Sequence, residues 1–284
     1  NGSNHQSDRM GLVDGEASVA FTYLIMYKLT AEESYIVYAK KQCQFVLDND
    51  YQVTSDDLIQ GRAGIIILML LVYKTTQDKM YLDIAQKVGT NLVESIQSKN
   101  CLAGMAHGYS GMAVAMALLG KYTGEENYKE IVLELCRKED QLFDYSMNNW
   151  LDIREGREHP RNTVAWCHGS AGILLARALI HKISGLTMDQ LFKDIPLNQV
   201  IDQMCQTEKT DWCLCHGQAG LLIVERYICH VFGYEEEKWY ENVAKYLDKR
   251  LSIEDILNYG MMQGLVGIGI FLLFWEWERD KDTK

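Results

Sequence analysis

The stretch GRAGIIILMLLVY, residues 61–73, sets the pattern for the whole chain. Two glycines three residues apart are followed at once by an apolar run, which predicts a buried helix that begins in a closely packed turn. The same motif recurs at Gly108–Gly111, Gly169–Gly172, Gly217–Gly220 and Gly264–Gly267, and a degenerate copy begins at Gly15. The chain is therefore built from an internal repeat.

The spacing of the motifs locates one insertion. Successive first glycines are 46, 47, 61, 48 and 47 residues apart. We place the extra residues of the long interval within Asp144–Arg161, a polar stretch that contains Asn148, Asn149, Arg154 and Pro160.

Each repeat has the pattern of a helical hairpin. A polar turn follows the apolar helix, as at residues 123–126, and leads into a second helix that opens with an aromatic residue at Tyr81, Tyr128 and Trp239. Apolar residues in the second helix recur at helical spacing. We expect the first helix to be buried and the second to keep one exposed face.

Six such hairpins predict an all-α fold, an α/α toroid with an inner and an outer ring of helices. An open helical solenoid uses the same hairpins and remains an alternative. The buried inner helices favour the closed ring. The chain has only two prolines, Pro160 and Pro196, which agrees with mainly uninterrupted helices.

The residue before each first glycine carries the candidate chemistry. These residues are Asp14, Gln60, His107, His168, His216 and Gln263. One position earlier lie Cys167 and Cys215, in consecutive repeats. If the repeats are equivalent in space, these side chains converge at the N-termini of the inner helices.

Two segments, AWCHG at 165–169 and CLCHG at 213–217, point to a metal. Their potential ligands are Cys167, His168, Cys213, Cys215 and His216. Zinc prefers thiolate and imidazole ligands, and a catalytic zinc takes three from the protein and keeps one position open. A single Cys-His pair is more often part of a core, but two pairs at matching repeat positions favour a metal. Spacing does not choose three of the five.

These segments resemble the zinc signatures of the lanthionine-synthetase cyclase (LanC-like) family, in WCHGSAGI at 166–173 and CHG at 215–217. GMAHGYSG at 104–111 is similar to the family's histidine motif, and DLIQGRAG at 57–64 to its aspartate motif. The Cys-His-Gly form of the first signature and the segment 148–150 look most like the C-terminal cyclase domain of a class II (LanM-type) lanthipeptide synthetase. The resemblance covers about residues 11–278.

The resemblance implies one zinc ion per chain and a catalytic pair beside it. The implied zinc ligands are Cys167, Cys215 and His216, and the implied catalytic residues are His107 and Asp57. His107 titrates near neutrality and would donate a proton, while Asp57 would orient His107 or a substrate amide. Capping of the following helix is a competing role for Asp57.

Several features depart from the family pattern or stay open. Asp56 competes with Asp57, and no roles follow for His168 and Cys213. The family's arginine four residues before the first zinc cysteine is replaced here by Thr163, and no role is assigned to the nearby Arg161. The family has seven hairpins, so we expect one of about 45 residues to lie upstream in a longer polypeptide. Residues 1–10 would then be a linker or disordered, and residues 11–284 an N-terminally incomplete LanC-like domain.

The implied reaction adds a peptide cysteine thiol to dehydroalanine or dehydrobutyrine, which forms lanthionine or methyllanthionine rings. The expected partners are a dehydrated precursor peptide with a leader and a dehydratase domain or subunit. The alternative is a LanC-like zinc protein without cyclase activity that binds glutathione or a protein partner. Another α/α-barrel enzyme, such as a glycosidase or prenyltransferase, is disfavoured, because a glycosidase needs paired carboxylates and the position before the glycines holds one, Asp14.

Composition limits the remaining classes. A net charge of −11 argues against nucleic acid binding. The longest apolar runs, such as residues 65–73, are too short to predict a transmembrane segment. No signal peptide is recognisable, and eight scattered cysteines fit reduced thiols in a cytoplasmic protein.

Overall fold

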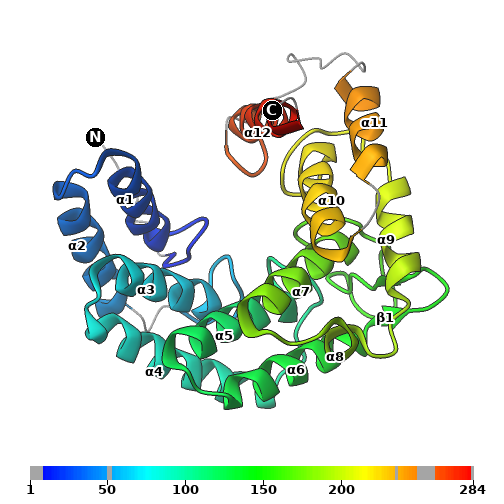
Figure 1. Cartoon of the computed structure of the whole chain (residues 1–284). Coiled ribbons are helices and arrows are strands. Elements are labelled where there is room, and N and C mark those ends of the chain that lie inside the picture. The colour runs from blue at the N-terminus through cyan, green and yellow to red at the C-terminus, as the bar shows by residue number, and fades with distance from the viewer. Residues whose placement is uncertain (1–8, 50–52, 234–235, 248–259, 283–284) are drawn as a thin grey trace, which may run out of the picture. The chain divides into compact units, whose positions relative to one another are not determined.

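The computed structural model describes residues 9–49, 53–233, 236–247 and 260–282, which form mainly helices (Figure 1). Each of six inner helices begins directly after the first glycine of a repeat. These helices are α1 (Glu16–Thr30), α3 (Arg62–Thr76), α5 (Tyr109–Thr123), α7 (Ser170–Ser184), α10 (Gln218–Phe232) and α12 (Leu265–Asp282). The outer helices are α2 (Ser34–Asp48), α4 (Lys79–Gln97), α6 (Asn127–Asp140), α8 (Met188–Phe192), α9 (Leu197–Gln206) and α11 (Glu236–Leu247). The predicted all-α class is confirmed.

Contacts within the chain define two compact units. The first contains residues 1–141 and 180–191, and its hairpins α1–α2, α3–α4 and α5–α6 pack side by side (Figure 1). The second contains residues 142–179 and 192–284, where α10 packs against α9, α11 and α12. In the second unit, a short antiparallel strand pair, β1 (Phe143–Asp144) and β2 (Asn149–Trp150), lies at the start of the predicted insertion.

The second glycine of the motif is required by a close backbone contact. A Cβ atom at Gly220 would lie 1.8 Å from the carbonyl oxygen of Leu214, and one at Gly111 would lie 2.3 Å from that of Met105. Both contacts reach six residues back, so the loop that carries the site residues folds closely against the helix that follows it. Only glycine allows this approach without a shift of backbone.

The burial of the hairpins follows the sequence pattern in the middle repeats. Helices α3 and α5 are largely buried, and the aromatic residues that open the second helices, Tyr81, Tyr128 and Trp239, are also buried. The expectation of full burial is wrong for α1 and α12, where Leu29 and Leu273 are 75% and 73% exposed. Within their units, helix α1 packs mainly on α2 and α3, and α12 packs mainly on α10.

Three details differ from the expected hairpins. The outer segment of the fourth repeat is split into α8 and α9, and Pro196 occupies the N-cap of α9. In the described residues the sixth repeat is the single helix α12 rather than a hairpin, because that helix takes up residues 265–282. Met10, expected in a linker, is 4% exposed, and the Arg9 carbonyl accepts a hydrogen bond from the Glu16 N–H at 2.9 Å. Residues 1–8 of the predicted linker lie outside the described residues.

Among the helices in the described ranges, none combines the length and the apolar character that crossing a bilayer requires.

Candidate metal centre and histidine–aspartate pair

The second unit brings together the three residues expected to bind zinc. One ligand atom from each of Cys167, Cys215 and His216 lies within 4.8 Å of the other two. Cys167 lies in the loop before α7, and the other two lie in the loop before α10. The three predicted ligands therefore form one group.

Main-chain hydrogen bonds explain why these loops meet. The Cys167 N–H donates to the Cys215 carbonyl at 3.3 Å, and the Cys215 N–H donates to the Met262 carbonyl at 2.9 Å. All three residues lie two positions before the first glycine of their repeat. The first unit has the same bond, from the Val13 N–H to the Ile59 carbonyl at 3.2 Å. Within each unit, corresponding residues of consecutive repeats are therefore neighbours in space.

The donor set fits a catalytic zinc ion. Two sulfurs and one imidazole are ligands that zinc prefers, and tetrahedral bonds of about 2.0–2.3 Å place ligand atoms about 3.3–3.8 Å apart. The observed group needs to contract only slightly to reach that spacing. The two cysteines are half-buried and His216 is exposed, so a fourth position open to a substrate is compatible with the surroundings.

The two thiols strongly influence each other. Their mutual hydrogen bond lowers the pKa of Cys167 to about 7, and the positive charge of Arg154 acts in the same direction against the effect of burial. The same hydrogen bond and burial raise the pKa of Cys215. The pair can therefore lose one proton near neutral pH, as binding of a cation requires.

Cys213 and His168, whose roles the sequence left open, differ from the three ligands. Cys213 forms a second group with Asp211 and His216, but its sulfur accepts a hydrogen bond from the His216 N–H at 3.4 Å and its own N–H donates to Asp211 at 3.0 Å. Burial raises the pKa of Cys213 to about 11. His168 is 1% exposed and belongs to the core.

The first unit brings together the two residues expected to be catalytic. The His107 Nδ1 atom lies 3.0 Å from Oδ2 of Asp57. Asp57 is almost fully buried, and it also accepts hydrogen bonds from the Gln60 N–H and the Ser55 hydroxyl, each at 2.7 Å. Burial alone would raise the pKa of Asp57, but these hydrogen bonds outweigh it and lower the pKa. The carboxylate therefore fixes the ring of His107, whose side chain is 39% exposed.

The neighbouring Asp56 serves a different cluster. Its carboxylate pairs with Arg62 at 2.5 Å and with Lys99 at 3.6 Å, and it accepts a hydrogen bond from the Ser95 hydroxyl at 2.7 Å. These contacts join the motif loop to helices α3 and α4. The geometry thus pairs Asp57, and not Asp56, with His107, and Asp57 combines this contact with the capping bond to Gln60.

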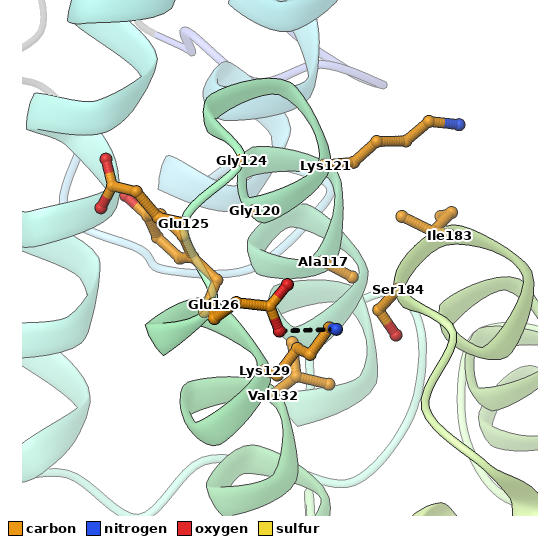
Figure 2. Close-up of a pocket in the computed structure, with 11 residues that line it drawn as sticks. Ala117, Gly120, Lys121, Gly124, Glu125, Glu126, Lys129, Val132, Ile183 and Ser184 are labelled. Carbon is orange, nitrogen blue, oxygen red and sulfur yellow. Dashed lines mark ion pairs between the residues drawn. The ribbon is translucent and has the colours of Figure 1, made fainter.

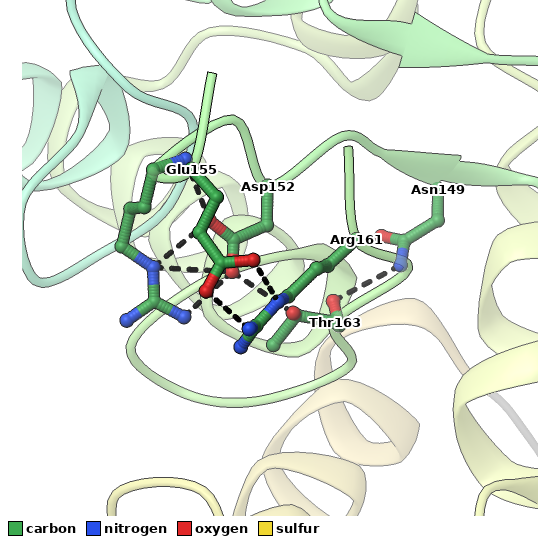
Figure 3. A network of polar contacts seen from close by, with 6 residues as sticks. Asn149, Asp152, Glu155, Arg161 and Thr163 are labelled. Atoms are coloured by element: carbon green, nitrogen blue, oxygen red, sulfur yellow. Dashed lines mark hydrogen bonds and ion pairs between the residues drawn. The ribbon is translucent and has the colours of Figure 1, made fainter. Parts of the chain in front are cut away.

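The insertion supplies site residues that the sequence did not identify (Figure 3). The Oδ1 atom of Asn149 accepts a hydrogen bond from the Ser170 N–H at 2.8 Å, at the start of α7. Its amide nitrogen donates to the Thr163 carbonyl at 3.0 Å, and the Thr163 hydroxyl donates to Asp152 at 2.9 Å. The strand pair is thereby fastened to the loop that carries Cys167. The sequence had drawn attention to Asn149 and Thr163 but assigned neither a role, and it had not singled out Asp152.

Two arginines of the insertion have different surroundings. Arg154 binds Asp152 through Nε at 2.9 Å and Nη2 at 2.6 Å. Burial would raise the pKa of Asp152, but the hydrogen bonds from Arg154 and Thr163 lower it to about 2. Arg161 pairs instead with Glu155 at the exposed edge of the insertion (Figure 3).

Two cavities lie away from these residues. One of about 210 Å³ lies beside α5 in the first unit, where Lys129 pairs with Glu126 at 2.6 Å near Ser184 (Figure 2). The other, of about 670 Å³, lies between α9, α10 and α11, and the buried Glu225 lines it. Neither cavity is lined by the residues expected to bind zinc or to move a proton.

Comparison with known proteins gives a family and a fold. The family model described as lanthionine synthetase C-like protein matches residues 1–278. The solved structure of nisin cyclase is similar with a TM-score of 0.66 and 19% identity, over 95% of this chain and 77% of that chain. A search of curated proteins finds no match.

Two carbohydrate-active enzymes share the fold at lower similarity. They are a sugar epimerase from a ruminal bacterium (TM-score 0.56, 11% identity, 87% of this chain and 76% of that chain) and the GH76A alpha-1,6-mannanase from Salegentibacter sp. HEL1_6 (TM-score 0.52, 15% identity, 88% and 79%). The predicted fold class, an all-α fold of the α/α-toroid type, is confirmed by the helices and by these likenesses. Closure of the ring remains a prediction.

Proposed function

Because the chain belongs to the lanthionine synthetase C-like family, we propose that it is a zinc-dependent peptide cyclase. It would add cysteine thiols to dehydroalanine or dehydrobutyrine and so close lanthionine and methyllanthionine rings. The observation that carries this proposal is the convergence of Cys167, Cys215 and His216 within 4.8 Å. These residues would hold one zinc ion.

When bound, zinc would supply a Lewis acid that favours the thiolate form of a substrate cysteine at neutral pH. Two features of this chain suit that chemistry. The hydrogen-bonded thiols of Cys167 and Cys215 lose a first proton near neutral pH. The side chain of His216 is exposed, which leaves room for the peptide to approach.

His107 would supply the proton that completes the addition. Attack of sulfur on the β-carbon leaves an enolate, and the α-carbon must then be protonated. Asp57 holds Nδ1 of His107 at 3.0 Å, so the other ring nitrogen, Nε2, would be the atom that delivers the proton. The buried carboxylate would also stabilise the charged imidazolium form before transfer.

The proposed substrate is a dehydrated precursor peptide with a leader, prepared by a dehydratase domain or subunit in the cytoplasm. The nisin cyclase likeness and the family support a peptide substrate of this kind. The class II context is supported by the segment Asn148–Trp150, in which Asn149 joins the insertion to α7.

The test combines metal analysis with a cyclisation assay. The purified protein should contain about one zinc per chain. Cys215→Ala should lose the zinc and the activity, whereas Cys229→Ala, which removes a buried thiol of α10, should keep both. Cyclisation does not change the mass of the peptide. Ring formation on a dehydrated peptide is therefore measured as the loss of thiols that an alkylating reagent can modify.

The outcomes separate the alternatives. Equal zinc content in the two variants would refute the ligand assignment. Zinc lost only in Cys215→Ala, with no cyclisation by the wild type, would favour the zinc protein that binds glutathione or a protein partner.

A further inference from the structure

The segment that carries His107 folds back on itself as a tight turn. The Tyr109 N–H donates to the Leu102 carbonyl at 3.0 Å, and Leu102 and Gly108 form a β-bridge between the two arms of the turn. A Cβ atom at Gly108 would lie 2.6 Å from the nitrogen of Gly104, so the two arms are in direct contact. The position of His107 therefore depends on how this turn is held.

The buried carboxylate of Glu139 holds the turn from the outer helix α6. Glu139 is 1% exposed. Its Oε1 atom accepts hydrogen bonds from the Gly104 N–H at 3.0 Å and from the Ser110 N–H at 3.1 Å, and the Ser110 hydroxyl lies 2.8 Å from both carboxylate oxygens. Gly104 and Ser110 lie three residues before and three residues after His107. One oxygen atom therefore joins the two arms of the turn.

Glu139 also caps the inner helix α5. Gly108 occupies the N-cap of α5 and makes no side-chain capping bond, whereas Glu139 bonds the first-turn N–H of Ser110 from another helix. A negative charge is favourable at a helix N-terminus, and hydrogen bonds to an ionised acceptor are roughly twice as strong as neutral ones. A carboxylate is costly to bury without such partners. These contacts therefore fix the turn and the start of α5 against α6.

Asp57 and its neighbour contact the same turn from the preceding repeat. The Oδ2 atom of Asp57 lies 3.0 Å from Nδ1 of His107, and the Leu58 N–H donates to the Ala106 carbonyl at 3.2 Å. Ala106 and His107 are adjacent in the turn. Both contacts therefore depend on the shape of the turn that Glu139 holds.

We infer that Glu139 is a positioning residue for His107. By bonding Gly104 and Ser110 it fixes the turn, and the turn aligns Nδ1 of His107 with Asp57 so that the proton is delivered to one face of the substrate α-carbon. The inference rests on the proposed function. Glu139 acts through His107 rather than on the substrate.

The first measurement requires neither zinc nor activity. An ionised Asp57 only accepts hydrogen bonds, so it selects the neutral form of His107 that carries its proton on Nδ1. Long-range proton–nitrogen NMR spectra of protein labelled at histidine, recorded at a pH where histidine is neutral, report which ring nitrogen is protonated. His107→Asn assigns the signal. Glu139→Gln should shift His107 from the Nδ1-protonated form toward the Nε2-protonated form.

The second measurement follows cyclisation of a dehydrated peptide, corrected for the enzyme-free reaction. Glu139→Gln should keep the zinc, give mixed configuration at the α-carbon and slow ring closure by up to about a hundredfold, as a displacement of about 1 Å can do. A loss of stability alone lowers the amount of active protein but leaves the product in one configuration. Glu134→Gln, the matched control, removes an exposed charge from the same helix and should match the wild type in both measurements.

Ser110→Ala is the milder variant, because it removes only the hydroxyl that bonds Glu139. It should shift both measurements in the same direction as Glu139→Gln, and it decides the question if Glu139→Gln does not fold. A folded variant with the wild-type histidine spectrum and a single product configuration overturns the inference, even if its stability is lower. A wild type that does not cyclise overturns the proposed function, and the histidine spectra then decide separately whether Glu139 positions His107.

Discussion

Replacement of Gly169 by alanine should disrupt the metal centre through the backbone. Gly169 has a φ of +81°, in the left-handed region, and a Cβ there would lie 1.5 Å from the Thr163 carbonyl oxygen and 2.7 Å from the carbonyl carbon. Both atoms belong to main chain, so no side-chain rotation can relieve the contact. The segment between Thr163 and Gly169, which includes Cys167, has to move.

The size of the effect follows from three terms. The left-handed conformation costs alanine about 1–2 kcal/mol, and forcing the buried segment apart costs about 1–3 kcal/mol. Movement of Thr163 also breaks the bonds of Asn149 to its carbonyl and to the Ser170 N–H, at about 1 kcal/mol each. The sum, about 4–7 kcal/mol, is a large part of the stability of a typical domain. We therefore expect the loop to detach and the metal to be lost.

Gly233→Ala is the matched control for Gly169→Ala. Gly233 lies in the same unit with a φ of +72°, and its Cβ would meet nothing within 4 Å. It should lose only the conformational term of about 1–2 kcal/mol. Denaturant unfolding and zinc content are measured for both variants. If Gly169→Ala keeps its zinc and unfolds within 1 kcal/mol of Gly233→Ala, the reasoning from the Thr163 contact is refuted.

Two further predictions concern ionisable groups. His107→Asn should keep the zinc but slow ring closure by about a hundred- to ten-thousand-fold and give mixed configuration at the α-carbon, measured near neutral pH against enzyme-free controls; a wild-type rate with one configuration would assign the proton to another group. Burial raises the pKa of Glu225 from 4.5 to about 7. The folded state therefore holds this proton more tightly than the unfolded state does. The protonated Glu225 stabilises the fold fully below pH 4.5, and this contribution to the unfolding free energy is lost as the pH rises to about 7. Glu225→Gln retains an acceptor for the Asn242 amide and should raise the unfolding free energy at pH 8 by about 3 kcal/mol, with little change at pH 4; an effect that does not vary with pH would contradict the buried-carboxyl explanation.

The repeat made the helices predictable from sequence. The glycine motif marks a loop whose backbone contacts need glycine, as at Gly220, and the helix begins at the next residue in every repeat. Tyr81, Tyr128 and Trp239 identify the second helices because each buries a large ring in the first turns. These signals are local in sequence, and because they recur from repeat to repeat, the assignment of helices in one repeat supports the assignment in the others.

The insertion and the helix ends were less predictable because they depend on contacts distant in sequence. Asn149 acts through Thr163 and Ser170, 14 and 21 residues away, and no periodicity connects such positions. Arg161 lies nearer to Cys167 in sequence, but it pairs with the exposed Glu155, whereas Arg154 pairs with the buried Asp152. The split of the fourth outer helix at Pro196 likewise interrupts a pattern that the other repeats follow.

The choice of ligands also required more than spacing. Cys213 and Cys215 are only two residues apart, yet the N–H of His216 bonds to the sulfur of Cys213 and leaves that of Cys215 facing Cys167. His107 pairs with Asp57 rather than Asp56 because Asp56 is engaged by Arg62 of α3 and by Lys99, two residues beyond α4. The sequence reduces the number of candidate cysteines and aspartates, and the packing of the folded chain determines which of them form the site.

The main-chain bonds between consecutive motif loops separate architecture from chemistry. The positions they join carry Val13 and Ile59 in the first unit and Cys167, Cys215 and Met262 in the second, although the bonds themselves involve only peptide groups. The side chain at each of these positions is therefore not needed for the bonds that join the loops. A repeat protein of this kind can acquire a reactive group by one codon change in one repeat, and lose it again, while the assembly of its helices stays untouched.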